Sequence, residues 1–380
     1  MDFSLTREQV DIQKAAKEFA KGEFDPDAAL EYDEKQQFPS VIWKKAAELG
    51  FVGVHVPEEY GGQELGLFEN VLIVEAFCRQ DSGIGMALAL SDFGSEMILR
   101  HGNEGQKRRI LPIVAQGEGI VTLAFLEQGY SLAPFETSAR MNTDGYIVDG
   151  KKSFVTLGGL AQYIIVVCQT KLDDQFGQSA ILVESRADGV DVVSMGEKMG
   201  MRMIPVDQVS FTNARIPQEN LIGKEDGGYL HLRDFLNEAR IETAAMGVGI
   251  AQGGVDRALE YSKKREQFGR AIVTFEVIRN KLADMYADVE LARLMTYKAA
   301  WLFDRGEPDI RCSLMSKMVA TGAAYRVTND ALQIHGGQGY MTEGHIEHYY
   351  RDAKVLDLFL EPGQSQRNML ANEITGKYHA

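Results

Sequence analysis

The stretch Arg351-Asp-Ala-Lys-Val-Leu-Asp-Leu-Phe-Leu-Glu-Pro-Gly-Gln-Ser-Gln-Arg367 governs how the whole chain is interpreted. It crosses from a loop into the last predicted helix. Within it, Pro362 fixes its own φ and restricts the backbone of Glu361 before it. Leu360 comes just before this pair, and its apolar side chain cannot accept a proton. If this stretch contains a proton acceptor, it must therefore be a residue other than Leu360.

The two ends of this stretch carry a specific resemblance. Arg351-Asp-Ala-Lys354 and Gln366-Arg367 resemble the RDAK and QR ends of a segment in the acyl-CoA dehydrogenases, flavoproteins that remove a proton and a hydride from an acyl-CoA thioester. In that family, the Glu of an intervening YEGT sequence takes the α-proton. The segments align without a gap, so the resemblance implies that Leu360 stands at a vacated base position. Glu361, one residue later, is an alternative base.

Length, charge and cysteine content point to an ordinary globular enzyme. The 380 residues have a formal net charge of −15, which argues against nucleic-acid or anionic-membrane partners because both need a basic face. Three widely spaced cysteines favour neither a disulfide framework nor a zinc site. The longest apolar runs are far shorter than the roughly 20 residues of a membrane helix. No signal peptide is recognisable, and we expect a cytoplasmic enzyme.

The hydrophobic pattern predicts an α+β protein in three parts. Residues 1–118 have helical periodicity, beginning at a capping box formed by Thr6 and Gln9, and include a PEEYGG connector like that of the family. Residues 119–227 contain short β-branched and aromatic runs, which predict a small β-barrel or sandwich. Within it, Asp149-Gly150 predicts a hairpin turn. Residues 228–380 return to helical periodicity and are predicted to form a four-helix bundle. The resemblance implies the acyl-CoA dehydrogenase fold.

Several further segments match the family's FAD-binding motifs. Lys264–Ile272 is similar to R-x-Q-F-G-x-x-I, Asp330–Tyr340 is close to DAVQILGGNGY, and Ser153–Gly159 resembles WITNGG. Arg265 suits a pyrophosphate, and the resemblance implies that its segment reaches the FAD of a neighbouring subunit. The implied cofactor-binding residues are Phe125, Leu126, Phe154, Thr156, Arg265, Gln267, Phe268, Gln333, Gly336, Gly337 and Gln364.

The resemblance also implies partners and substrate contacts. An acyl-CoA thioester is the implied substrate, an electron-transfer flavoprotein or similar protein the implied electron acceptor, and a homotetramer, a dimer of dimers, the implied assembly. The implied substrate-binding residues are Ser131, Asn237, Arg240 and Leu360, with the backbone N–H of Leu360 polarising the thioester oxygen. The family's second base position falls on Ala239, which also lacks a carboxylate. Glu238 is one residue away and is expected to point elsewhere, because one step along a helix rotates a side chain by about 100°.

Asp92 is the candidate catalytic base. It ends the apolar run Gly83–Leu90, in a region that lines the acyl pocket of the family. A carboxylate in such a pocket should have a raised pKa. The alternative interpretation is that Asp92 caps a helix over Phe93–Arg100.

A base across the pocket could remove the γ-proton of a conjugated thioester, which resembles the cyclic-diene-forming family members that act on cyclohex-1-ene-1-carboxyl-CoA. Three alternatives are an ordinary α,β-dehydrogenase that uses Glu361, a catalytically silent flavoprotein scaffold, and redox-neutral chemistry on the same fold.

Two other patterns are interpreted as structural. Gly247-Val-Gly249 begins like a dinucleotide fingerprint, but it lacks the third glycine and lies in a helical pattern, so we expect a close helix contact. His345-x-x-His348 has no supporting carboxylate or cysteine ligand, and no metal site is predicted.

Overall fold

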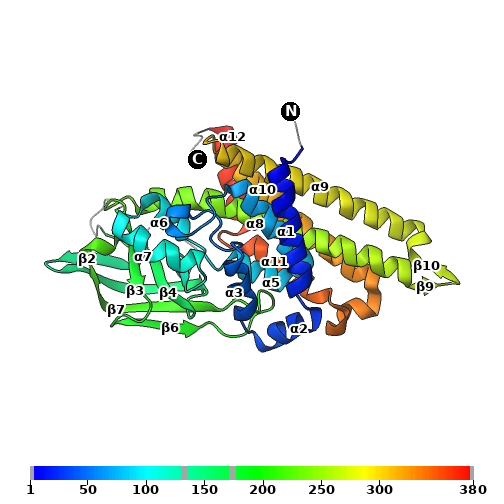
Figure 1. Ribbon diagram of the computed structural model, residues 1–380, viewed down its shortest axis with the longest axis horizontal. Coiled ribbons are helices and arrows are strands. Elements are labelled where there is room, and N and C mark those ends of the chain that lie inside the picture. The colour runs from blue at the N-terminus through cyan, green and yellow to red at the C-terminus, as the bar shows by residue number, and fades with distance from the viewer. Residues whose placement is uncertain (1–3, 130–134, 171–176, 377–380) are drawn as a thin grey trace.

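A computed structural model describes residues 4–129, 135–170 and 177–376. The chain begins with a group of helices, continues through a β-sheet and ends in long helices (Figure 1). The helices of the first part are α1 (Arg7–Glu23), α2 (Pro26–Lys35), α3 (Ser40–Glu48), α4 (Leu67–Gln80), α5 (Ser82–Ala89), α6 (Ser95–His101) and α7 (Glu104–Ala115), with the 3₁₀ turn η1 (Glu58–Tyr60).

The predicted start of the first helix is confirmed. Thr6 accepts a hydrogen bond from the Gln9 N–H, and the Gln9 side chain accepts one from the Thr6 N–H, which completes the capping box. The next helix is capped by Asp25, with Pro26 at its first position. Helices α4 and α5 are mostly buried, and they carry the apolar run that leads to Asp92.

The middle part is built on one mixed sheet. Its strands are β1 (Ile120–Ala124), β2 (Ser138–Asn142), β3 (Gly145–Thr156), β4 (Ala161–Gln169), β5 (Gln178–Glu184), β6 (Val190–Ser194), β7 (Val206–Pro217) and β8 (Leu221–Ile222). Among the described residues the strand order is β6-β7-β3-β2-β4-β5-β8, and β1 pairs in parallel with β4. A 3₁₀ turn, η2 (Gln218–Asn220), precedes β8. The predicted fold class is confirmed, with this sheet as the central β domain.

The hairpin predicted at Asp149-Gly150 is wrong. Strand β3 runs through both residues, and the turn that joins β2 to β3 lies instead between Asn142 and Gly145. The pairing of β3 with β7 shifts register at Gly150, which has a φ of +136°. A Cβ atom there would lie 2.5 Å from the Thr137 Cα. The glycine therefore permits an irregular strand and a close backbone contact rather than a turn.

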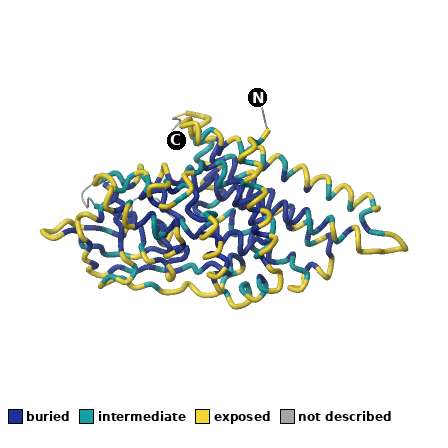
Figure 2. Tube along the Cα trace, in the orientation of Figure 1, coloured by how far each residue is buried: buried dark blue, intermediate teal, exposed yellow. Residues whose placement is uncertain are grey.

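The last part consists of long packed helices. They are α8 (Gly228–Lys264), α9 (Glu276–Asp304), α10 (Ile310–His335), α11 (Glu347–Leu358) and α12 (Gly363–Thr375), with short strands β9 (Glu266–Gln267) and β10 (Arg270–Ala271) and the 3₁₀ turns η3 (Ile272–Thr274), η4 (Gly336–Tyr340) and η5 (Thr342–Gly344). The long helices extend away from the sheet to the β9–β10 hairpin (Figure 1). Buried residues concentrate where the three parts meet (Figure 2).

The glycine pattern in α8 is a helix contact, as predicted. A Cβ atom at Gly247 would lie 3.0 Å from the backbone of Ala320 in α10, and one at Gly249 would lie 2.6 Å from the Glu75 carbonyl oxygen in α4. Small residues at these positions let α8 pack closely between two other helices.

Cys78, Cys168 and Cys312 are all buried and free. Burial raises the pKa of Cys78 well above its ordinary value and raises the pKa of Cys168 to about 12. Burial also raises the pKa of the Cys312 thiol, where Asp309 acts in the same direction. The thiolate forms are therefore strongly disfavoured.

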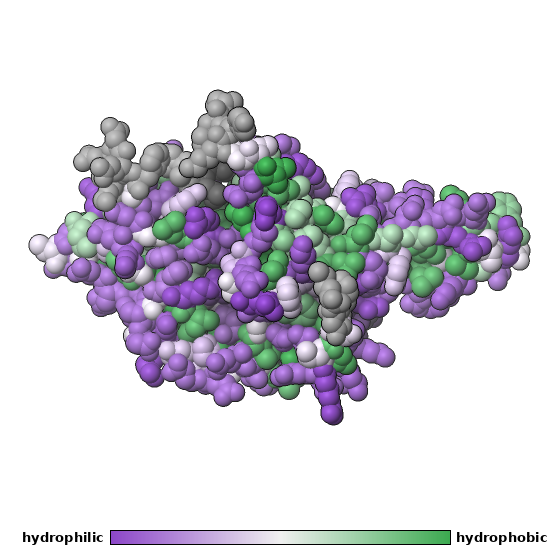
Figure 3. Space-filling model, turned by 90° about the horizontal axis from the view of Figure 1, so that it is seen from above, coloured by the Kyte–Doolittle hydropathy of each residue, from purple (hydrophilic) through white to green (hydrophobic). Residues whose placement is uncertain are grey.

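Large apolar side chains remain exposed along the arm of long helices. On α9 these are Val277, Tyr286, Leu291, Leu294 and Trp301. Figure 3 shows hydrophobic and polar residues side by side over this arm. None of the helices that the structure describes is both long enough and apolar enough to cross a membrane.

Candidate active site

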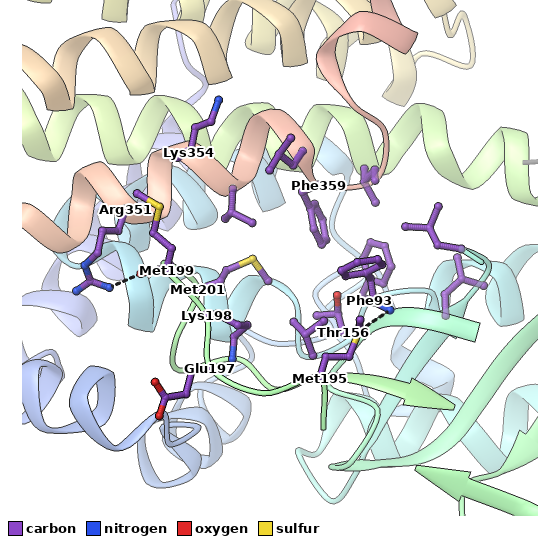
Figure 4. A pocket seen from close by; sticks show the side chains of 18 of the residues that line it. Phe93, Thr156, Met195, Glu197, Lys198, Met199, Met201, Arg351, Lys354 and Phe359 are labelled. Carbon is purple, nitrogen blue, oxygen red and sulfur yellow. Dashed lines mark hydrogen bonds between the residues drawn. The ribbon is translucent and has the colours of Figure 1, made fainter. Parts of the chain in front are cut away.

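A cavity of about 340 Å³ lies between the sheet and the C-terminal helices. It is lined by Phe93, Leu123, Phe125, Leu126, Phe154, Thr156, Met195, Glu197, Lys198, Met199, Gly200, Met201, Val206, Arg351, Lys354, Val355, Leu358, Phe359 and Leu360. These residues come from all three parts of the chain (Figure 4). The predicted residues Phe125, Leu126, Phe154, Thr156 and Leu360 therefore meet at one cavity.

Aromatic rings form one wall of this cavity. Phe93 lies 5.8 Å from Phe359, measured between ring centroids, and 5.0 Å from Phe235. Figure 4 shows Phe93 and Phe359 approaching each other from opposite elements. Glu197 is the one acidic residue in the described lining, but it is exposed, and its side chain points away from this aromatic pair (Figure 4). The inner wall is thus apolar and suited to a hydrocarbon group.

Leu360 lines the cavity, whereas Glu361 does not. The Glu361 carboxylate accepts two hydrogen bonds from Arg240, at 2.6 and 3.0 Å, and both side chains are at most 3% exposed. Arg240 also donates to Asn237 at 2.7 Å. A bidentate, buried pair of this kind is held firmly, because either charge alone would be uncompensated. Glu361 is therefore engaged by Arg240 rather than free beside the cavity.

A buried lysine supports the same segment. Lys317, in the middle of α10, is fully buried and donates to the carbonyl oxygens of Phe359 and Glu361, at 2.6 and 3.0 Å. Burial lowers the pKa of Lys317 to about 7, although the nearby Glu361 carboxylate acts against this shift. Sequence reasoning missed this residue. A single lysine among the small and apolar residues of a long helix was the available signal, but such a position does not reveal its partner.

Asp92 directly precedes the cavity residue Phe93 in the chain, but it is not itself among the residues that line the cavity. Its carboxylate accepts a hydrogen bond from the Gly53 N–H at 2.9 Å, and the residue is only partly exposed. It does not cap the following helix, which begins at Ser95 after Gly94 and has no side-chain cap. Burial is the main cause that raises the pKa of Asp92 to about 6; Glu96 raises it further, and His55 opposes the rise. Such a pKa suits a general base near neutral pH.

Further carboxylates lie behind Asp92. Glu96, Glu238 and Glu242 are all buried, and Glu238 forms an ion pair with Arg100. Burial and mutual repulsion raise the pKa values of Glu96 and Glu242. Glu238 is thus engaged by Arg100 and is not among the residues that line the cavity. Sequence reasoning missed the cluster, because its members come from separate helices.

A second buried ion pair holds the loop after β1. Lys152 donates to the Glu127 carboxylate at 2.7 Å and to the Phe125 carbonyl oxygen at 3.3 Å. Glu127 also accepts bonds from the backbone N–H groups of Glu136 and Thr137. These contacts hold Phe125 and the neighbouring Leu126 at the cavity. The motif match at Glu127 could have suggested a structural role, but its partner could not be predicted.

The remaining predicted residues lie elsewhere. Arg265, Gln267 and Phe268 are exposed at the β9–β10 hairpin, distant from the sheet in Figure 1, and Phe268 is 94% exposed. Three others, Gln333, Gly336 and Gly337, are exposed where α10 ends. Gln364 is exposed and donates to Asn368 rather than lining the cavity. Ser131 lies outside the described residues. One chain therefore does not bring all of the predicted FAD contacts to one place.

His348 pairs with Asp81 at 3.1 Å, and both side chains are buried. This contact explains the second histidine of the His345-x-x-His348 pattern. Among the described residues, no group of three or more His, Cys, Asp or Glu side chains gathers as a metal site.

Comparison with known proteins identifies the class to which this fold and cavity belong. Models of the acyl-CoA dehydrogenase N-terminal, middle and C-terminal domains match residues 6–118, 126–214 and 226–375. The chain belongs to the acyl-CoA dehydrogenase family. It is therefore an FAD-dependent oxidoreductase.

Individual relatives match along almost their whole length. The chain is 35% identical to the probable acyl-CoA dehydrogenase YngJ of Bacillus subtilis, over 98% of this chain and 100% of that protein. It is 34% identical to the acryloyl-CoA reductase (NADH) of Anaerotignum propionicum, over 98% and 96%. The butyryl-CoA dehydrogenase structure from Megasphaera elsdenii superposes with a TM-score of 0.94, at 30% identity over 99% and 100%.

The cavity fits part of such a cofactor. Phe154 has a φ of +55° and is 42% exposed, and its neighbour in the lining, Thr156, carries a hydroxyl group. Together with Phe125 and Leu126 they offer an aromatic and polar surface for a planar ring. FAD, when bound, accepts a hydride from the substrate.

Proposed function

We propose that this enzyme dehydrogenates a cyclic, conjugated acyl-CoA. The proposed reaction converts cyclohex-1-ene-1-carboxyl-CoA to cyclohexa-1,5-diene-1-carboxyl-CoA by 1,4-elimination. Asp92 would take a proton from the γ-carbon, the electrons of that C–H bond would form a double bond between the γ- and β-carbons, and the original double bond would shift to join the α-carbon to the ring carbon on its other side. That ring carbon would lose a hydride, which the FAD held by this site would accept. The two hydrogens removed thus leave as one proton and one hydride.

This proposal rests on the absence of a carboxylate at both base positions that the family resemblance implies. Leu360 and Ala239 occupy the two base positions that the family resemblance implies, and neither has a proton acceptor. Glu361 is buried against Arg240, which weakens the alternative of an ordinary α,β-dehydrogenase. Asp92, the residue before the cavity residue Phe93, remains as a partly exposed carboxylate with a pKa suited to a base. Its partial exposure supports access to a ligand, which requires the carboxylate to turn from Gly53 toward the cavity.

The absence of an α-carbon base suits a γ-proton reaction. A conjugated thioester acidifies its γ-proton through the double bond, so a base on another wall of the cavity can remove it. The apolar lining formed by Phe93, Phe359 and Leu360 would exclude water around a hydrocarbon ring. Asn237 and Arg240 are proposed to lie along the substrate path, and Ser131 to contact CoA.

Anaerobic bleaching of the bound flavin tests the proposal. Cyclohex-1-ene-1-carboxyl-CoA should bleach the wild-type enzyme, whereas butyryl-CoA should not. Asp92→Asn should retain FAD and lose bleaching, and Glu361→Gln should keep both, although with lower stability. Bleaching by butyryl-CoA that is lost in Glu361→Gln would instead establish the α,β-dehydrogenase. FAD retention without bleaching by straight-chain, branched or cyclic thioesters would favour a silent scaffold, and turnover without an electron acceptor would favour redox-neutral chemistry.

We also propose that the protein works as a homotetramer, a dimer of dimers, and passes electrons to an electron-transfer flavoprotein. The exposed ring of Phe268 supports assembly, because Arg265, Gln267 and Phe268 lie too far along the arm to serve their own chain's cavity (Figure 1). Light scattering of the purified protein tests the assembly. Phe268→Ser should weaken FAD retention, and a monomer that retains FAD fully would contradict this arrangement.

A further inference from the structure

The segment from Phe359 to Glu361 forms an unusual tight turn. The Glu361 N–H donates to the Phe359 carbonyl oxygen at 2.8 Å, which closes a three-residue γ-turn around Leu360. Leu360 has a φ of +64°, a value that residues other than glycine rarely adopt. A γ-turn with positive φ at its centre is rare and strained. Surrounding contacts must hold it in place.

Lys317 supplies those contacts at both ends of the turn. Its ammonium group donates to the carbonyl oxygens that flank Leu360, at 2.6 and 3.0 Å, and its side chain is fully buried. Gln366 adds a bond to the Glu361 carbonyl oxygen at 3.3 Å, while Arg240 fixes the Glu361 carboxylate. A buried ammonium group is costly unless bonded, so these carbonyl oxygens and Lys317 stabilise one another.

The turn leaves one backbone donor free beside the cavity. Leu360 is 3% exposed and lines the cavity, yet its N–H donates to no protein acceptor in the part of the chain that the structure describes. Buried backbone N–H groups are almost always paired. An acceptor on a ligand would satisfy this one.

We propose that Lys317 is a positioning residue, which holds the 359–361 turn so that the Leu360 N–H meets the carbonyl oxygen of a bound thioester. Lys317 does not touch the substrate. By holding the Phe359 carbonyl group, it fixes the peptide plane that contains the Leu360 N–H and hence the direction of that N–H, while its bond to the Glu361 carbonyl oxygen anchors the peptide that follows the turn. This inference rests on the proposed function only in taking an acyl-CoA thioester as the ligand, and it does not depend on which carbon loses the proton.

The consequence is catalytic as well as structural. As a proton leaves the acyl chain, negative charge develops on the thioester oxygen, and a donor already aimed at that oxygen stabilises the charge. If the turn relaxed toward a negative φ, the N–H would rotate away from the ligand. Loss of Lys317 should therefore slow chemistry much more than it weakens binding, because the rest of the acyl-CoA site is unchanged.

Lys317→Met tests this inference, because methionine fills much of the same volume without a donor. Thr321→Val is the matched control: Thr321 is buried one turn further along α10, and its hydroxyl donates to the Lys317 carbonyl oxygen of its own helix. Cinnamoyl-CoA serves as the probe, since polarisation of its carbonyl group shifts its absorbance to longer wavelength and lowers its carbonyl stretching frequency.

Wild type and Thr321→Val should both shift the probe on binding. Lys317→Met should lose most of the shift, and its kcat should fall about 10²-fold with little change in KM. Lys317→Gln, which retains an amide donor, should recover part of both effects and serves as the second variant if the methionine variant does not fold. A full shift in either folded Lys317 variant, with FAD bound, would overturn the inference.

The same measurement separates this inference from the proposed reaction. Asp92→Asn should keep the probe shift and lose flavin bleaching by the cyclic substrate. If wild type does not oxidise the cyclic substrate but the probe shift still depends on Lys317, the proposed substrate is wrong and the positioning role stands. If the cyclic substrate is oxidised but the probe shift is independent of Lys317, the proposed substrate stands and the positioning role of Lys317 is wrong.

Discussion

Replacement of Asp92 by Asn should stabilise the protein near neutral pH while removing its activity. Asp92 has an ordinary pKa of 3.8, and burial raises it to about 6 in the folded protein. The folded state therefore binds this proton more tightly than the unfolded state does. Stability that this group supplies is fully present below pH 3.8 and is lost as the pH rises to about 6.

The magnitude follows from the size of the rise in pKa. One pKa unit corresponds to about 1.4 kcal/mol, so an ionised Asp92 costs the folded state up to about 3 kcal/mol, less any screening where the carboxylate reaches solvent. Asn cannot ionise, and its side-chain oxygen can still accept the hydrogen bond from the Gly53 N–H. The variant should thus gain little below pH 3.8, progressively more between pH 3.8 and about 6, and up to about 3 kcal/mol above that.

Urea unfolding of the FAD-loaded proteins between about pH 4.5 and pH 8 measures this difference. The stability of Asp92→Asn relative to wild type should rise with pH and level off above about pH 6, and wild-type kcat/KM should rise with a midpoint near pH 6 as the base loses its proton. A stability difference that is independent of pH would refute the reasoning. The reasoning would also be refuted if wild-type kcat/KM fell at acidic pH with a midpoint near 4, the ordinary pKa of a carboxyl group.

Two further predictions concern packing and charge. Arg240→Met should destabilise the protein by about 3–5 kcal/mol in urea unfolding, because it leaves Glu361 charged and buried, and the double variant Arg240→Met/Glu361→Leu should recover most of that loss; equal stability of wild type and the single variant would contradict this. Gly85→Ala should lower the melting temperature, since its Cβ would lie 2.5 Å from the Cys78 nitrogen, whereas Gly22→Ala, with nothing within 4 Å, should raise stability by about 0.5–1 kcal/mol. Similar shifts in the two glycine variants would show that the contact at Gly85 relaxes freely.

Local signals in the sequence were sufficient for the overall architecture. The capping box at Thr6 lies within a few residues, and Gly247 and Gly249 lie on one helix. Sequence periodicity and composition can therefore predict both features. The prediction of a hairpin at Asp149-Gly150 was wrong because the same dipeptide also occurs within irregular strands. The choice between the two depends on a close contact with Thr137, the residue that directly precedes the partner strand β2, and the composition of the dipeptide does not reveal that contact.

The candidate site was predictable where a motif marked it. Leu360, Thr156 and Phe125 stand in segments with family counterparts, and the structure brings them to one cavity. The bidentate contact between Arg240 and Glu361 could not be predicted, because those residues are 121 positions apart. Asp92 was predicted from its place after an apolar run, but its bond to Gly53 depends on the packing of separate helices.

The enclosed cysteines have a consequence for an enzyme that handles unsaturated thioesters. A conjugated enoyl thioester is an electrophile, and a thiolate can add to its double bond and become permanently alkylated. Because Cys78, Cys168 and Cys312 are all buried and held in the protonated form, such a substrate meets no reactive sulfur on this chain. If the enzyme takes the conjugated thioester proposed above, it can therefore bind this electrophile repeatedly without self-inactivation through its thiols.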